Sequence, residues 1–349
     1  MMKEWYNDKI KVSKETSMVK LKDIAQAAGV SVTQVSRALN NHSDVSEDTK
    51  RKVKEIAKEM GYIKNTTAQK LVMQVSNQIA LVIKGFTNPS NSVEYNSIYP
   101  LLCGINRYIN EVDHELVVYM LQENTESYTE YFQSKGIQGA ILFGFDYDDK
   151  KLHELLETNY PCVCIDIPIQ GKNKGCVIIN NTLYATQAVE ALIVSGKKHI
   201  AMISGTPKAI VSIEREAGYR IALHKHNFTL QKGYICDGNF RQKRAKELTR
   251  ELLQTYPEID AFFCASDYMA LGCMEMLREM GKSIPQDIAV IGFDNMPITK
   301  YVTPKLSTVS QNDEQKGYEA AKLLVDIMHR DIEDKTVILS CEIKLRESV

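Results

Sequence analysis

Short, almost uninterrupted apolar runs recur from residue 79 onward, and they constrain the fold more than any other feature. The runs are IALVI, ELVVYML, GAILFG, CVCIDI, VIIN, HIAMISG, AFFCAS and IAVIGFD, with stretches of helical periodicity between them. Strands that are buried on both faces have this composition, whereas strands with one wet face alternate apolar and polar residues. The repeated alternation of strand and helix predicts an α/β fold with doubly wound parallel sheets.

The length of this region predicts two sheets rather than one. Its roughly 270 residues exceed what one sheet of this kind needs, so we expect two lobes. We place the first lobe at about 78–179 and 311–338, and the second at about 180–310 and 339–349.

Residues 18–64 have the pattern of a small all-helical domain. LKDIAQAA has apolar residues at helical spacing and is followed by Gly29, and Ser31 is a suitable N-cap for a second helix from about Val32 to Leu39. Ser46 caps a third helix, which Gly61 ends. Three short helices, the first two joined by a tight glycine turn, predict a helix-turn-helix unit.

The charge distribution separates this helical domain from the rest of the chain. Residues 18–70 contain ten lysines and arginines against six acidic residues, although the whole chain has a net charge of −1. A basic head on an acidic body suits a nucleic-acid-binding module joined to another function. We expect residues 1–17 to be a disordered extension, and the polar segment 65–77 to be a hinge and linker with one short helix.

Several classes of protein are disfavoured. No apolar run reaches the roughly 18 residues of a membrane span, and the N-terminus lacks the apolar core of a secretion signal, so we expect a cytoplasmic protein. The eight cysteines include no CxxC pair, which predicts buried reduced thiols and no metal. Walker, GxSxG and HExxH motifs are absent from the sequence, so we expect no catalytic residues, no cofactor and no enzyme activity.

Polar residues follow several of the predicted strands. In doubly wound sheets ligands bind beyond the carboxyl ends of the strands. Carboxylates and a guanidinium bind neighbouring hydroxyls, and an aromatic ring covers the apolar face of a sugar. Because residues of all three kinds follow these strands, the sequence predicts a polyol site. Lys84 follows the first strand, and a cation there would suit a phosphorylated or acidic sugar. The other predicted site residues are Asp166, Arg215, Phe240, Ser266 and Asp294.

The segment VKLKDIAQAAGVSVTQVSRALNNHSDVSEDTKRKVKEIAKEMGYIKN resembles the DNA-binding head of the lactose-repressor (LacI/GalR) family. The motifs SIEREAGYRIAL, AFFCASDYMALGCM, IPQDIAVIGFDN and LRES resemble that family's regulatory domain, and together the resemblance covers essentially residues 19–348. It implies a two-lobed body, similar to periplasmic sugar-binding proteins, that closes on a small-molecule effector. The site residues other than Lys84 match the family's effector-contacting positions.

The resemblance also implies roles in DNA binding. Val32, Thr33 and Arg37 match the positions that face the bases of the major groove. Ala68 and Leu71 match the hinge residues at the minor groove, and other DNA contacts are expected from Lys20, Lys22, Ser31, Gln34, Lys50 and Asn65. Gln34 departs from the family's usual Thr, either as a packing substitution at the turn or as a polar contact to the DNA backbone. Ser266 departs from the usual Asn.

The expected function is that of a transcriptional regulator, a repressor of carbohydrate genes whose affinity for double-stranded operator DNA is switched by a sugar or sugar-phosphate. One head contacts few base pairs, so we expect a homodimer on a near-palindromic operator. A sugar-binding protein of a transport or sensing system, without DNA binding, is the alternative. That protein would have a secretion signal and no basic head.

Overall fold

The computed structural model divides the chain into two compact units, residues 1–76 and 77–349, which are described separately below. The described residues are 19–39, 41–42, 44–62, 78–84, 98–112, 114–122, 124–330 and 335–349. The predicted N-terminal extension, residues 1–17, and the predicted hinge, residues 65–77, therefore lie outside the described residues.

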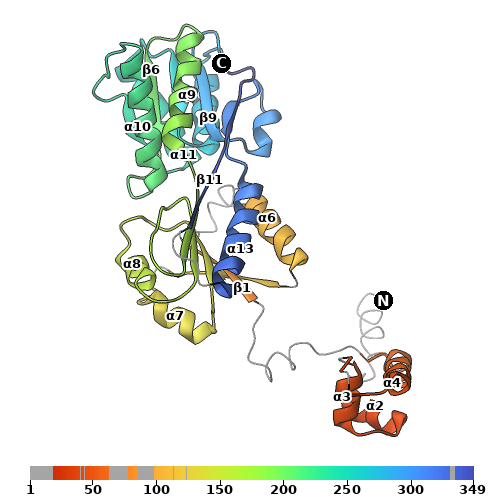
Figure 1. Cartoon of the computed structure of the whole chain (residues 1–349). Coiled ribbons are helices and arrows are strands. Elements are labelled where there is room, and N and C mark those ends of the chain that lie inside the picture. The colour runs from red at the N-terminus through yellow and green to blue at the C-terminus, as the bar shows by residue number, and fades with distance from the viewer. Residues whose placement is uncertain are drawn as a thin grey trace, which may run out of the picture. The chain divides into compact units, whose positions relative to one another are not determined.

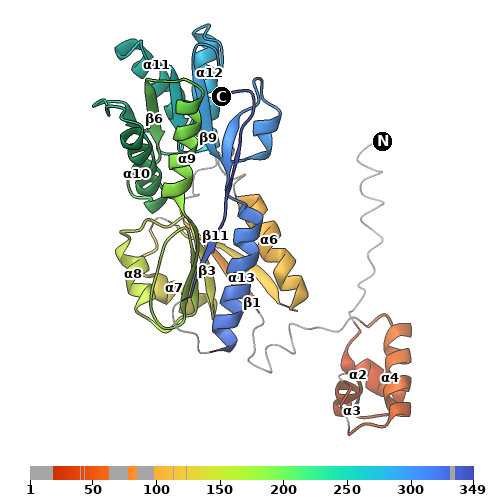
Figure 2. The same ribbon diagram turned by 45° about the horizontal axis from the view of Figure 1, so that its top comes forward.

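In the described part of the first unit, helices α2, α3 and α4 surround a small apolar core (Figure 2). They are α2 (Leu21–Ala28), α3 (Val32–Leu39) and α4 (Glu47–Glu59). Gly29 takes a left-handed φ of 70° between the first two helices, where a side chain would strain the backbone. Each helix contributes a fully buried residue to the same core cluster: Ile24, Val35 and Val53. The predicted helix-turn-helix head is confirmed.

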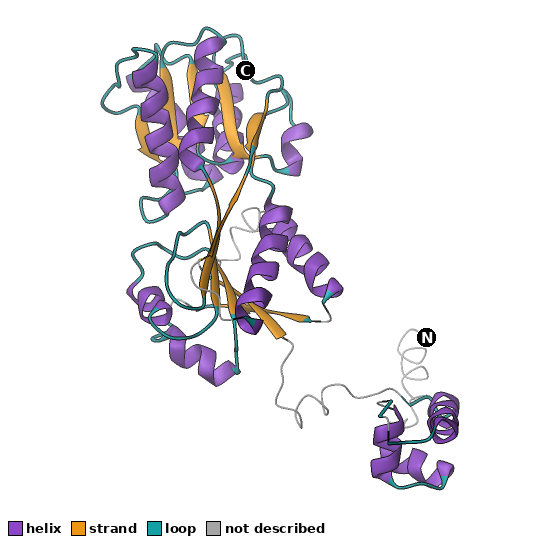
Figure 3. Cartoon of the chain, in the orientation of Figure 1, coloured by secondary structure: helices purple, strands orange, loops and turns teal. Residues whose placement is uncertain are grey.

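The second unit contains two sheets, each flanked by helices (Figure 3). The first sheet has the strand order β11-β5-β4-β3-β1-β2, and all of its neighbouring strands run parallel. Its strands are β1 (Gln78–Ile83), β2 (Glu115–Met120), β3 (Ala140–Phe143), β4 (Cys162–Ile165), β5 (Lys174–Ile179) and β11 (Lys335–Leu339). Its helices are α6 (Ile98–Glu111), α7 (Tyr128–Lys135), α8 (Lys150–Leu156) and α13 (Asp313–His329). We call this part lobe 1.

Lobe 2 is built on the order β12-β10-β9-β8-β6-β7, in which only β12 pairs antiparallel. Its strands are β6 (Ile200–Ser204), β7 (Ile235–Asp237), β8 (Ala261–Cys264), β9 (Ala289–Asp294), β10 (Ser307–Ser310) and β12 (Glu342–Lys344). Its helices are α9 (Asn181–Val194), α10 (Ile210–Lys225), α11 (Gln242–Thr255), α12 (Asp267–Glu279) and the 3-10 turn η3 (Pro297–Lys300). The chain passes between the lobes after β5, after β10 and after β11 (Figure 1).

Burial on both faces of the strands explains the near-continuous apolar runs. In β1, Ile79, Leu81 and Ile83 join the core cluster on one face, and Ala80 and Val82 join the cluster on the other. Successive side chains of a strand point to opposite faces, so both faces of this sheet are covered. The predicted fold of two doubly wound parallel sheets is confirmed.

Helices α6 and α13 of lobe 1 cross closely enough to require glycine. A Cβ atom on Gly104 would lie 1.8 Å from the carbonyl oxygen of Glu314, and one on Gly317 would lie 2.1 Å from that of Leu101. The two backbones are therefore in direct contact, as only glycine permits. This crossing fixes the first turn of α13 beside the ends of the lobe 1 strands.

Candidate functional site

The outward face of α3 carries the residues predicted to contact bases. Val32, Thr33 and Arg37 are exposed, while Val35 and Ala38 on the opposite face are fully buried. The guanidinium of Arg37 is bonded to the carboxylate of Asp44, in the loop between α3 and α4, with about half of each side chain exposed. An exposed ion pair of this kind is weak, so Arg37 can exchange Asp44 for another acceptor.

Gln34 has a structural role that explains its place at the start of α3. Its backbone N–H donates to Ser31 Oγ at 3.2 Å, and the backbone N–H of Ser31 donates to Gln34 Oε1 at 3.1 Å. This reciprocal pair is a capping box, which satisfies two backbone donors at the helix start. The pattern S-x-x-Q is present in the sequence, and the capping box explains Gln34 without a packing role because its side chain is exposed. Its contact with the DNA backbone stays a prediction.

We expect Gln34→Ala to destabilise the head by about 1 kcal/mol, because one helix-terminal donor loses its partner. Gln26→Ala is the matched control, since Gln26 is an exposed residue of α2. Calorimetry of both variants measures the effect. Equal stability of the two variants would show that the capping box contributes nothing.

The predicted contacts to the DNA backbone differ in their surroundings. Lys20 and Lys22 are exposed, whereas the side chain of Lys50 is only 10% exposed and its ammonium donates to Glu47 at 2.7 Å. In the absence of DNA the ammonium of Lys50 is therefore paired with Glu47, and its contact with a phosphate stays a prediction. The remaining predicted DNA contacts, Asn65, Ala68 and Leu71, lie outside the described residues.

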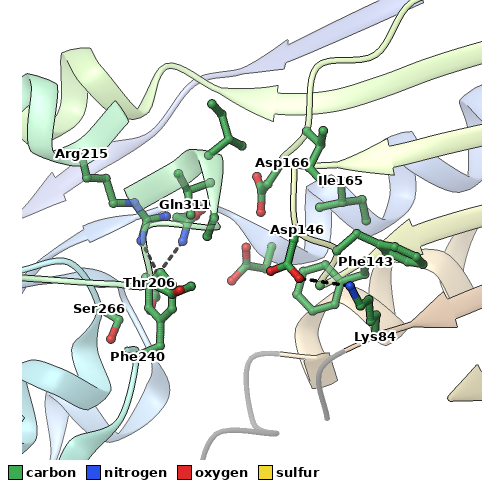
Figure 4. Close-up of a pocket in the computed structure, with 18 of the residues that line it drawn as sticks. Lys84, Phe143, Asp146, Ile165, Asp166, Thr206, Arg215, Phe240, Ser266 and Gln311 are labelled. Atoms are coloured by element: carbon green, nitrogen blue, oxygen red, sulfur yellow. Dashed lines mark hydrogen bonds and ion pairs between the residues drawn. The ribbon is translucent and has the colours of Figure 1, made fainter. Parts of the chain in front are cut away.

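A cavity of about 440 Å³ lies in the second unit and is lined by residues of both lobes. Figure 4 shows side chains of lobe 2, among them Arg215 and Phe240, facing side chains of lobe 1, among them Asp166. All six residues predicted from strand ends line it: Lys84, Asp166, Arg215, Phe240, Ser266 and Asp294. The carboxyl ends of the parallel strands bring these residues together, as the fold class requires.

Arg215 is the most enclosed charge of lobe 2 in this cavity. Its side chain is 4% exposed, its Nε donates to Asn181 Oδ1 at 2.9 Å, and one terminal nitrogen donates to the carbonyl of Ala265 at 2.6 Å. The same nitrogen lies 3.8 Å from a carboxylate oxygen of Asp294, and the guanidinium carbon lies 3.8 Å from the ring centre of Phe293. These contacts hold the guanidinium rigidly at the cavity wall.

Three of the predicted residues have left-handed backbones. The φ angles are 63° for Asp166, 55° for Phe240 and 120° for Asp294. Such conformations are costly for residues other than glycine and are concentrated at functional sites, where the surrounding structure maintains them. The backbone geometry therefore marks the same positions as the strand-end argument.

Ser266 also has a structural role in the fold. It is the N-cap of α12, and its Oγ accepts a hydrogen bond from the backbone N–H of Met269 at 3.3 Å. Only 4% of the residue is exposed, so its hydroxyl is fixed at the cavity wall.

Lys84 lines the cavity but is already paired. Its ammonium donates to Asp146 at 3.0 Å and also to Asp149, which in turn accepts from the hydroxyl of Tyr128 at 2.8 Å. Burial acts to lower the pKa of Lys84, but the hydrogen bonds to Asp149 and Asp146 outweigh it and hold that pKa above its ordinary range. Asp146 and Asp149 thus neutralise the charge of Lys84, which we expected to suit a phosphorylated or acidic sugar.

A group of polar residues between β10 and the first turn of α13 was not among the predicted site residues. Gln311, Asp313 and Lys316 all line the cavity, and Lys316 has a side chain that is only 1% exposed. Its ammonium donates to Asp166 at 2.8 Å and to Gln311 at 2.6 Å. The segment NDEQKGYEAAKLL looks like a solvated helix start, and the partner Asp166 is 150 residues away in sequence.

The carboxyl group of Asp294 faces the cavity and has a strongly raised pKa. Burial raises its pKa from 3.8 to about 7, and the neighbouring Arg215 opposes that rise. The neutral form therefore persists in the folded protein at pH values where the unfolded chain would be ionised.

This shift predicts a pH dependence that Asp294→Asn should remove. Between about pH 4 and pH 7 the folded state holds a proton that the unfolded state releases, so the contribution of Asp294 to stability falls as the pH rises through this window. The variant cannot ionise, so its stability relative to the unchanged protein should improve from pH 4.5 to pH 7.5, as unfolding experiments at a series of pH values would measure. Parallel pH profiles for the two proteins would contradict the assignment.

Among the described residues, no group of three or more His, Cys, Asp or Glu side chains is arranged to hold a metal ion. Among the helices of the described ranges, none is long and apolar enough to cross a bilayer.

A helix-turn-helix head joined to a two-lobed body with a polar cavity defines a class of ligand-responsive DNA-binding proteins. Comparison with known families agrees with this class: residues 20–65 match the model of bacterial regulatory proteins of the lacI family, and residues 189–349 match a periplasmic binding protein-like domain. The chain belongs to the lacI family, and it is a DNA-binding transcriptional regulator rather than an enzyme.

Relatives that match over nearly the whole chain support this assignment. The probable HTH-type transcriptional repressor ExuR of Bacillus subtilis (strain 168) is 33% identical over 336 residues, which cover 95% of this chain and 98% of the relative. The HTH-type transcriptional regulator MalR of Clostridium butyricum is 31% identical over 94% of this chain and 98% of its own length.

Solved structures show the same fold. A complex of the transcriptional regulator CelR with cellobiose superimposes with a TM-score of 0.73 at 29% identity, covering 95% of this chain and all of that one. The lac repressor dimer bound to operator and the anti-inducer ONPF gives a TM-score of 0.81 at 23% identity, covering 95% and 99%.

Proposed function

We propose that this protein is a repressor of carbohydrate genes that binds its operator as a homodimer and releases it when a sugar occupies the cavity between the lobes. The observation that carries the proposal is the cavity lining. Asp166 and Asp294 each use one carboxylate oxygen for a protein contact among the described residues, which leaves the other oxygen for sugar hydroxyls. Phe240 offers a ring for the apolar face of a sugar.

The charges of the lining favour an uncharged sugar over a sugar phosphate. Lys84 is paired with Asp146 and Asp149, and Lys316 is paired with Asp166 and Asp313. A phosphate would have to compete with these carboxylates for either lysine. The related CelR has a solved structure in complex with cellobiose, which is an uncharged sugar.

DNA reading is assigned to Val32, Thr33 and Arg37, which share the exposed face of α3. Lys20 and Lys22 would contact phosphates, which position a head on DNA without reading its sequence. Two heads supply the specificity that one lacks, so the operator is expected to be near-palindromic. The protein would act in the cytoplasm, and residues 65–77 would transmit lobe movement to the heads.

The test is a thermal-shift screen of the full chain against cellobiose, maltose, galactose, glucuronate, galacturonate and glucose 6-phosphate. A bound ligand raises apparent stability by mass action. We expect one of the uncharged sugars to raise the unfolding temperature. A rise with glucose 6-phosphate or a uronate alone would contradict the uncharged class, and no rise with any compound would contradict the sugar-responsive function.

A further inference from the structure

A buried polar chain links the two halves of the cavity. It runs from Asp166 in lobe 1 to the ammonium of Lys316 at 2.8 Å, and from Lys316 to the side-chain oxygen of Gln311 at 2.6 Å. The amide nitrogen of Gln311 then donates to Asp294 in lobe 2. We call these four residues the interlobe relay.

The interlobe relay lies where the chain passes from lobe 2 to lobe 1. Gln311 follows β10 of lobe 2 directly, and Lys316 lies in the first turns of α13 of lobe 1. Gln311 is 5% exposed. Any change in the angle between the lobes must therefore stretch or rearrange these hydrogen bonds, because they bridge the joint.

Lys316 keeps its charge in this enclosed position. Burial acts to lower its pKa, but the carboxylates of Asp166 and Asp313 outweigh it and leave the pKa above its ordinary value. A buried ammonium is tolerated only when it is paired and hydrogen-bonded. Its contacts in the described part of the chain are Asp166, Gln311 and, at 3.6 Å, Asp313.

We propose that Lys316 is a positioning residue that couples sugar binding to the arrangement of the lobes, by holding Asp166 and, through Gln311, Asp294 in register for one sugar. This inference rests on the proposed function. A sugar that contacts the remaining oxygen of each carboxylate would tighten or loosen the relay, and the lobe angle would change with it. Lys316 then acts through the two carboxylates rather than by touching the sugar.

The test compares Lys316→Met with Lys322→Met, an exposed lysine on the same helix. For each full-length protein, the sugar that shifts the unchanged protein most in the panel above is titrated, and operator affinity is measured with and without it. We expect Lys316→Met to bind that sugar at least tenfold more weakly and to lose most of the sugar's effect on operator affinity even at saturation. Lys322→Met should behave like the unchanged protein.

A double-variant comparison separates positioning from general stability. If Lys316 acts through Asp166, then Lys316→Met combined with Asp166→Asn should weaken sugar binding no more than the worse single variant. Should Lys316→Met fail to fold, Gln311→Leu interrupts the relay without leaving a charge unpaired, and the same loss of coupling is expected.

The outcomes distinguish the two proposals. A foldable Lys316→Met or Gln311→Leu protein that binds sugar and releases operator within twofold of the unchanged protein overturns the role of Lys316 alone. Independent, multiplicative losses in the double variant overturn it as well. If the unchanged protein responds to no compound of the panel, the proposed function fails, and this inference fails with it.

Discussion

Arg215→Met should abolish the response of the protein to sugar and destabilise lobe 2. The substitution leaves the side-chain oxygen of Asn181 and the carbonyl of Ala265 without their donor, and it removes the cation beside Asp294. Each buried acceptor left without its donor costs about 1–3 kcal/mol of stability. Sugar affinity should fall by roughly 30-fold or more, since truncating a buried, hydrogen-bonded charge costs at least about 2 kcal/mol in binding.

Arg220→Met is the matched control for this prediction. Arg220 is on the same helix, α10, but its side chain is 48% exposed and bonded to Glu216 one turn away. A change of less than about 0.5 kcal/mol is expected there. Calorimetry and sugar titration measure both variants. The account of the cavity is wrong if Arg215→Met retains the sugar affinity of Arg220→Met.

Arg37→Ala should have the largest effect on DNA recognition. A bidentate arginine contact to guanine is worth about 1–3 kcal/mol, which is roughly 5- to 150-fold in affinity for each half-site. The substitution should also relax base preference at one position of each half-site. In the DNA-free head Asp44 holds the same guanidinium, so DNA binding must exchange that carboxylate for the base.

A control on α4 distinguishes base reading from charge. Arg51 is exposed and paired only with Asp48 among the described residues, so Arg51→Ala should weaken binding to all sequences alike. A selection of bound sequences from a random pool, made with each variant, measures the preference. An unchanged preference in Arg37→Ala would remove Arg37 from the base-reading residues.

Local patterns allowed much of the fold to be predicted. The second helix was expected from Val32 to Leu39 and has those ends, because capping residues and helical periodicity act within a few residues. Asp166, Arg215 and Asp294 were expected at one site because parallel strands share a carboxyl edge, and they line one cavity.

Pairing across long separations could not be predicted in this way. Lys316 looks like a surface lysine, and only the position of Asp166 beside it makes burial possible. Lys84 was expected to be a free cation, but the fold brings Asp146 and Asp149 into contact with its ammonium. Lys50 is the opposite case, because its partner Glu47 is three residues away and the pairing was visible in the sequence.

The central claim is that a sugar in the cavity controls operator affinity, and an operator titration tests it most directly. Fluorescence anisotropy with a labelled promoter fragment would be recorded with and without the sugar that gives the largest thermal shift. A coupling free energy of typical size changes affinity by about 5- to 150-fold, and we predict weaker operator binding in the presence of sugar. Operator affinity that stays the same while the sugar is demonstrably bound would contradict the account.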